Sequence, residues 1–85
     1  MELVIERMAT QALRSMPAQR ARLLIERLKA IAADPFAHHA NVERMAGTKD
    51  AFRLRQGSIR AVYRVDRIAS QMRVENIAPR GGVYK

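Results

Sequence analysis

The sequence predicts a small α+β domain in which two helices pack on one face of an antiparallel β-sheet. Between residues 8 and 32, apolar side chains recur at the three- and four-residue spacing of helices. From residue 51 to residue 77, apolar and charged side chains alternate instead, which is typical of strands with one buried face. The chain has 85 residues, the size of one domain, and we expect residues 1–85 to form it. Packing the helices on the apolar strand face buries both surfaces.

The first half of the chain predicts a strand followed by two helices. Residues Glu2-Leu3-Val4-Ile5-Glu6 are a short β-favouring run bounded by charges. A helical apolar pattern then runs from Met8 to Met16, and Pro17 separates it from a second helix, where proline suits the first turn. Asp34-Pro35 ends the second helix. The apolar stripe of this second helix consists of Ala21, Leu24, Ile25, Leu28, Ile31 and Ala32.

The second half predicts a loop and then three strands that form an antiparallel meander. Residues 36–47 show no sustained period, so we expect a loop there. A hairpin follows over residues 51–65 with its turn at Gln56-Gly57-Ser58, and residues 66–70 form a second turn. The third strand then runs to residue 77. The expected core face of the sheet comprises Phe52, Leu54, Ile59, Tyr63, Val65, Met72 and Val74, and alternation places Arg73, Glu75 and Ile77 on the opposite face.

Arginine dominates the charge of the chain and gathers on the sheet face away from the helices. The formal net charge is +8, and from Lys49 onward nine basic residues accompany three acidic ones. Because arginine binds phosphate bidentately and keeps its charge, we expect a polyanion such as RNA as partner. Contacts with about four or five phosphates would make single-strand binding weaken with salt at a log–log slope of about −3. The arginines of this face are Arg53, Arg55, Arg60, Arg64 and Arg73, and Arg80 follows the last strand.

Composition and spacing argue against several other classes of protein. The chain has no cysteine, which leaves no disulfide or thiolate metal site and suits the reducing cytoplasm. No apolar stretch approaches the roughly 20 residues that cross a bilayer, and residues 1–5 are too short and too acidic for a signal peptide. His38 and His39 have no carboxylate cluster beside them, so we expect a solvated loop there. We therefore expect a cytoplasmic protein without membrane contact, metal or cofactor.

Three segments resemble the RelE/ParE superfamily of toxins from bacterial type II toxin–antitoxin systems. They are residues 50–55, residues 57–65 and the C-terminal Arg80-Gly81-Gly82-Val83-Tyr84-Lys85. The helical hairpin before Asp34-Pro35 also looks like that of the family, so the resemblance covers nearly the whole chain. The middle segment is shared by both branches of the superfamily, whereas the terminal pattern is similar to the RelE branch, which cleaves messenger RNA. The resemblance therefore implies a RelE-like toxin domain.

The resemblance also implies a role for each residue that matches the family's motifs. Arg60 and Arg80 match the arginines that contact the scissile phosphate. Tyr84 matches the tyrosine that orients or deprotonates the attacking 2′-hydroxyl. Arg53 and Arg55 match two basic positions, usually lysines, that hold the RNA backbone. The resemblance thus implies metal-independent endoribonuclease activity in which Arg60, Arg80 and Tyr84 are catalytic.

The chain departs from the family pattern at Ile59, where tyrosine is usual, and at Gly81-Gly82, where a charged pair is common. Arginine in place of lysine also matters, because a pKa above about 12 makes a phosphate clamp and not a base. The proton acceptor is then either Tyr84, whose phenolate is favoured by surrounding positive charge, or Glu75 on the same sheet face. Two further arginines of that face, Arg64 and Arg73, are additional phosphate-binding candidates.

Partners follow from the same resemblance. It implies a cognate acidic antitoxin in a toxin–antitoxin hetero-oligomer, and messenger RNA in the ribosomal A site as substrate. An acidic inhibitor would also relieve the self-repulsion of this basic chain. Two alternatives stay open: a ParE-like inhibitor of DNA gyrase on the same fold, and a catalytically degenerate member that only binds RNA or an antitoxin.

Overall fold

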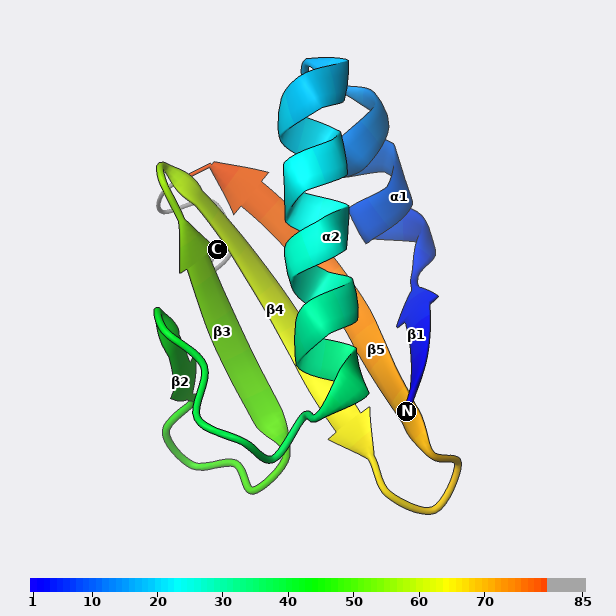
Figure 1. The fold of residues 1–85 in the computed structure, drawn as a ribbon, viewed down its shortest axis with the longest axis vertical. Helices are drawn as coiled ribbons and strands as arrows, with labels where there is room; N and C mark the ends of the chain where they lie inside the picture. Colours follow the sequence, from blue (N-terminus) through cyan, green and yellow to red (C-terminus); the bar gives the residue numbers. More distant parts are fainter. Residues whose placement is uncertain (80–85) are drawn as a thin grey trace.

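Two helices lie on one face of a mixed β-sheet in the computed structural model, which describes residues 1–79 (Figure 1). The first strand leads into a helical hairpin, and the predicted three-stranded meander ends the described chain, so the predicted α+β class is confirmed; one strand between the helices and the meander was not predicted. The elements are β1 (Glu2–Ile5), α1 (Arg7–Arg14), α2 (Ala18–Ala33), β2 (Val42–Arg44), β3 (Ala51–Gln56), β4 (Ile59–Asp66) and β5 (Gln71–Pro79). Within residues 1–79, no helix is long and apolar enough to cross a membrane.

The sheet has the strand order β1-β5-β4-β3-β2. Strands β3, β4 and β5 form the predicted antiparallel meander, and β1 adds to β5 in parallel, with Leu3 opposite Met72. The β3–β4 hairpin closes through Gly57-Ser58, and Gly57 has a φ of 60°, which side-chain-bearing residues rarely adopt. The first and the last strands of the described chain are therefore neighbours.

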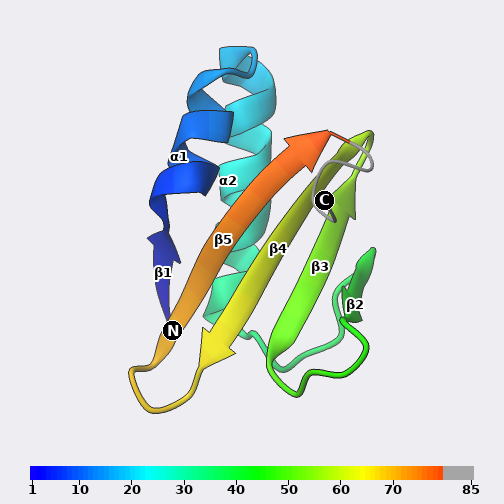
Figure 2. The same ribbon diagram turned by 180° about the vertical axis from the view of Figure 1, so that it is seen from behind.

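The core lies between the helices and the sheet and follows the predicted apolar stripes. From α2 it takes Leu24, Leu28, Ile31 and Ala32, which the helical period had selected. Tyr63 and Met72 are fully buried on the sheet side, as the alternation had indicated. Pro17 precedes α2, where its fixed φ starts the helix and its missing N–H costs no hydrogen bond. The opposite sheet face is not covered by either helix (Figure 2).

The prediction of a loop over residues 36–47 was wrong for its middle part. Val42–Arg44 forms the short edge strand β2, which pairs antiparallel with β3 and places Glu43 opposite Arg53. Three residues are too few to show a period, and the pairing depends on a partner strand that follows later in the chain. The missed strand matters for function, because it forms one wall of the candidate site.

The alternation was also wrong at the end of the last strand. A β-bulge falls opposite Val62 and Tyr63, where β5 has one residue more than β4. Glu75 is the additional residue, since the pairs on either side are Tyr63 with Val74 and Val62 with Asn76. The predicted side of Ile77 is thereby reversed: it is 2% exposed and belongs to the core. A count by twos cannot detect such an insertion.

Candidate nucleic-acid interface

Three arginines gather at one end of the uncovered sheet face. Strands β3 and β4 pair Arg55 directly with Arg60, and Arg53 lies two residues before Arg55 on the same side of β3. The three line one hollow of about 170 Å³. Its other walls come from Asn41, Val42 and Glu43 at the start of β2. The structure thus brings together three of the arginines that the sequence assigned to phosphate.

The direct opposition of Arg55 and Arg60 has an electrostatic cost. Like charges at directly paired positions of an antiparallel sheet destabilise the pairing by a few tenths to about 1 kcal/mol. Within residues 1–79, neither side chain forms an ion pair with a carboxylate. Two guanidinium groups beside a hollow, without a carboxylate partner among residues 1–79, have the charge and the donors to bind an anionic ligand.

Arg53 differs from these two because a carboxylate already contacts it. It donates a hydrogen bond to Glu43 across the β2–β3 pair and forms an ion pair with it. Both side chains remain partly exposed, at 31% for Arg53 and 62% for Glu43. Sequence reasoning missed Glu43, because the residue became a neighbour of Arg53 only through the unpredicted strand β2. A phosphate that binds Arg53 competes with this carboxylate.

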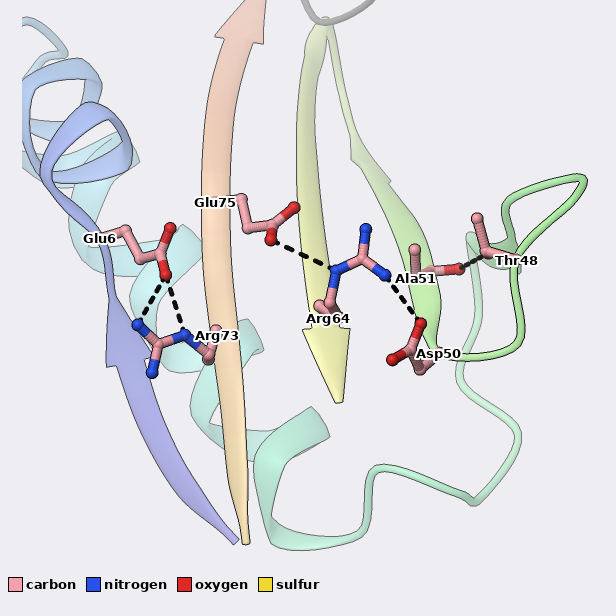
Figure 3. Close-up of polar contacts among 7 residues, drawn as sticks. All are labelled: Glu6, Thr48, Asp50, Ala51, Arg64, Arg73 and Glu75. Carbon is pink, nitrogen blue, oxygen red and sulfur yellow. Dashed lines mark hydrogen bonds and ion pairs between the residues drawn. The ribbon is translucent and has the colours of Figure 1, made fainter. Parts of the chain in front are cut away.

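Arg64 lies farther along the same face and bridges two carboxylates (Figure 3). Its Nη1 donates to Oδ1 of Asp50 over 2.8 Å, and its Nε donates to Oε2 of Glu75 over 3.3 Å. The hydrogen bond and negative charge of Glu75, with Asp50 adding to them, raise the pKa of the Arg64 guanidinium above its ordinary value. Its cationic state is thus secured, but its donors already serve the protein.

Arg73 is held in a similar way at the β1 side of the sheet. Its Nε donates to Oε2 of Glu6 over 2.8 Å (Figure 3). Its Nη1 donates to Oε1 of Gln71 over 2.9 Å. Arg64 and Arg73 are also direct cross-strand partners, and their carboxylates offset the repulsion between them. The structure therefore places these two predicted phosphate ligands in a separate ion-pair network, away from the hollow of the other three.

The remaining predicted site residues have different positions. Glu75 projects from the bulge on the uncovered face, where its carboxylate is engaged by Arg64. Arg80 and Tyr84 lie outside the described residues 1–79. Glu6 and Asp50, which no sequence pattern had indicated, form ion pairs with Arg73 and Arg64 on the open face. No local signal could have identified them, because the contacts are set by strand order.

A buried aromatic pair lies on the other side of the sheet, behind these arginines. The rings of Phe52 and Tyr63 stack with centroids 5.4 Å apart and an interplanar angle of 17°. The Tyr63 hydroxyl is buried and has no hydrogen-bond partner within the described residues. Burial raises the pKa of this hydroxyl to about 12, partly opposed by the positive charge of Arg27. Tyr63 therefore stays protonated at physiological pH.

No protein-family model and no curated protein sequence matches this chain, but solved structures do. A chain of the archaeal RelE–RelB complex from Pyrococcus horikoshii matches with a TM-score of 0.80 at 25% identity, over 95% of this chain and 96% of that one. The isolated RelE toxin of E. coli matches with a TM-score of 0.79 at 21% identity, over 98% of this chain and 89% of that one. The YoeB/ParE toxin from Agrobacterium tumefaciens matches with a TM-score of 0.76 at 19% identity, over 93% of this chain and 98% of that one. The resemblance drawn from the sequence motifs is thereby confirmed, and the chain has the fold of the RelE/ParE toxin superfamily.

Proposed function

We propose that this chain is the toxin of a toxin–antitoxin pair and an endoribonuclease of the RelE type, which cleaves messenger RNA on the ribosome. The main support is the pair Arg55 and Arg60, opposed across β3 and β4 beside a hollow and without a carboxylate partner in residues 1–79. If these arginines served only to make the surface hydrophilic, we would expect carboxylates beside them, as Asp50 and Glu6 lie beside Arg64 and Arg73. The toxin fold supports the same proposal.

The proposed reaction is attack by the RNA on its own backbone. The 2′-hydroxyl oxygen loses its proton and forms a bond to the adjacent phosphorus, and the bond from phosphorus to the 5′-oxygen breaks. The products are a 2′,3′-cyclic phosphate and a 5′-hydroxyl, whose oxygen gains a proton. Arg55 and Arg60 hold the phosphate and stabilise the charge that develops on it. Each well-aimed donor of this kind lowers the activation free energy by roughly 3 kcal/mol. Arginine cannot take the proton, because it has no free base at neutral pH.

Two residues are candidates for the proton acceptor, and a contact in the structure counts against Glu75. The Glu75 carboxylate already accepts a hydrogen bond from Arg64. That oxygen would have to leave Arg64 before it could take a proton from RNA. We therefore assign the role to Tyr84, which orients or deprotonates the 2′-hydroxyl, and we assign Arg80 to the leaving group.

The same proposal includes an antitoxin as partner. Several solved structures that match this chain are RelE–RelB toxin–antitoxin complexes, including those from E. coli and Methanococcus jannaschii. An acidic antitoxin segment would be attracted by the net charge of +8 and would compete with RNA for the uncovered arginines. Complex formation would then inhibit cleavage.

Mapping of RNA ends in a translating extract tests the enzymatic proposal. We expect purified protein to produce new 5′ ends within translated codons. Arg60→Gln and Tyr84→Phe should each reduce their yield at least about a hundredfold, the usual effect of removing a transition-state donor or a general base. Arg22→Gln, an exposed change on α2 outside the hollow, is the matched control and should cleave normally. Undiminished cleavage by both site variants would overturn the assignment.

A ParE-like action on DNA gyrase is the second candidate, since a YoeB/ParE toxin shares the fold. It predicts inhibition of supercoiling by the purified protein, without new RNA ends, and indifference to Tyr84→Phe. A supercoiling assay run on the same preparations therefore separates the two functions. If the protein shows neither RNA cleavage nor inhibition of supercoiling but still binds RNA, it is a degenerate binding protein.

A further inference from the structure

A second basic hollow lies on the helix side of the sheet, beside the edge strand β2. It has a volume of about 380 Å³, and Phe52 and Tyr63 contribute to its lining from the core-facing side of β3 and β4. In Figure 1, α2 runs over β4 and β5, and the connection from α2 to β2 crosses the end of the sheet beside β2. The hollow lined by Arg53, Arg55 and Arg60, called the Arg53 hollow below, lies against the opposite face of the sheet. Strand β2 therefore separates the two hollows.

The lining of this hollow combines positive charge with an exposed aromatic ring. Arg44, Lys49 and Arg67 contribute three exposed cations, and no carboxylate residue is among the lining residues in the described part of the chain. The Arg67 guanidinium lies 4.2 Å from the centre of the Phe36 ring. Phe36 is nevertheless 54% exposed. An aromatic ring with a cation beside it is a platform on which nucleobases stack.

Tyr63 forms part of the wall of this hollow, but its hydroxyl is buried and has no hydrogen-bond partner within residues 1–79. A buried hydroxyl is closed to a ligand in the hollow, so Tyr63 contributes shape and not hydrogen bonds. The three cations and the exposed Phe36 ring are what distinguish this hollow as a binding site.

We propose that this hollow is a second RNA-binding site, which takes one nucleotide of a single strand that also reaches the Arg53 hollow. The base stacks on Phe36, and the phosphate binds Arg44, Lys49 and Arg67. The alternation of β2 supports the link, because Glu43 lines the first hollow and Arg44, the next residue, lines the second. An acidic peptide would satisfy the cations but would leave the exposed ring unused. The inference rests on the proposed function only in taking RNA as the polyanion.

A single-tryptophan variant tests the stacking directly, because the chain contains no tryptophan. Phe36→Trp places the reporter in the hollow, and Leu23→Trp on α2 is the matched control, since Leu23 is 53% exposed and Phe36 is 54% exposed. The probe is a short single-stranded 2′-O-methyl RNA, which lacks the attacking hydroxyl and cannot be cleaved by the proposed reaction. We expect this RNA to quench the fluorescence of Phe36→Trp strongly and that of Leu23→Trp weakly. Equal quenching, or none at Phe36→Trp, would overturn the proposal.

Affinity measurements with charge variants complete the test. Lys49→Gln and Phe36→Leu should each weaken binding of the same RNA about tenfold, the order of magnitude for one stacked base or one released counterion at low salt. Lys29→Gln, an exposed lysine change on α2, should alter it less than about twofold, consistent with a charge outside both hollows. All are surface changes, and circular dichroism of each variant is the check that it is folded. Equal effects of Lys49→Gln and Lys29→Gln would refute the site.

The outcomes separate this inference from the proposed function. Quenching at Phe36→Trp by a protein that cleaves no RNA would leave the second site standing and refute the nuclease. Cleavage without such quenching would do the reverse. Quenching of the same variant by polyglutamate to the same extent as by RNA would refute the nucleotide site and indicate an acidic protein as its occupant.

Discussion

The buried hydroxyl of Tyr63 predicts that the protein loses stability at alkaline pH. In the unfolded chain the phenol ionises near its ordinary pKa of about 10. Burial in the folded protein raises this pKa to about 12. The folded state holds the proton more tightly than the unfolded state does. The contribution of this group to the free energy of unfolding is therefore fully present below a pH of about 10 and is lost as the pH rises through about 12. The loss is about 1.4 kcal/mol at pH 11 and tends to about 2.7 kcal/mol above that range.

Two measurements on matched variants check this value. The chain has two tyrosines, so Tyr84→Phe serves as the background in which tyrosinate absorbance reports Tyr63 alone. We expect its titration midpoint near 12 in the folded protein and near 10 in concentrated urea. Urea unfolding at pH 8 and pH 11 should then show a loss of stability larger by about 1.4 kcal/mol than that of the Tyr63→Phe partner variant. Lysine and arginine titrate in both variants and cancel in the comparison.

The prediction for Tyr63→Phe at neutral pH runs against the usual expectation for a core substitution. The variant removes a hydroxyl that has no partner within residues 1–79. Its free energy of unfolding should therefore lie within about 1 kcal/mol of the parent's value or exceed it. A folded-state midpoint near 10, or the same pH dependence for both variants, would show that the hydroxyl reaches water and would refute the reasoning.

Four further predictions concern the arginines and the bulge. Arg55→Thr should raise the free energy of unfolding by up to about 1 kcal/mol in urea titrations, because it relieves the repulsion with Arg60, while it weakens RNA binding; lower stability would count against that repulsion. Arg64→Gln should cost no more than about 1 kcal/mol in the same assay, because its ion pairs are partly exposed and screened, and a loss above about 2 kcal/mol would contradict this. With Arg64 and Arg73 engaged by carboxylates, filter binding of single-stranded RNA should show a log–log salt slope of about −3 for four phosphates, three at the Arg53 hollow and one at the second hollow, and a slope steeper than about −4 would implicate Arg64 and Arg73. Deletion of Glu75 should leave Ile77 in the core and preserve a cooperative thermal transition by circular dichroism, whereas deletion of Arg73 should abolish it; failure of both deletions would refute the register argument.

Local patterns were sufficient for most of the architecture. The stripe from Leu24 to Ala32 and the alternation through Tyr63 depend only on the periods of helices and strands, and both predictions were confirmed. The errors arose where long-range pairing decides the outcome. Strand β2 exists because β3 offers it an edge, and Ile77 turns inward because β5 has one residue more than β4. Neither condition can be read from the neighbouring residues.

The candidate site shows the same division between composition and geometry. Alternation placed five arginines on one face, but it treated them as equivalent. The structure divides them by their acidic neighbours: Arg64 and Arg73 bind carboxylates from other segments, and Arg55 and Arg60 face one another. These acidic neighbours lie up to 67 residues away in sequence, as for Glu6 and Arg73. Charge counting therefore predicted the polyanion but overstated the number of arginines available to it.

The position of β5 between β1 and β4 has a consequence for folding. The strand made last among the described residues is central in the sheet, and Glu2 at the start of the chain pairs with Gln71. A ribosome that has not yet released residues 71–79 therefore carries a hairpin and two amphipathic helices without the strand that joins them. Such non-local closure slows folding and prolongs the exposure of apolar surface. The sheet can be completed only after residues 71–79 have left the ribosome, and anything that binds the nascent chain before then meets the helices' apolar stripes and not the finished basic face.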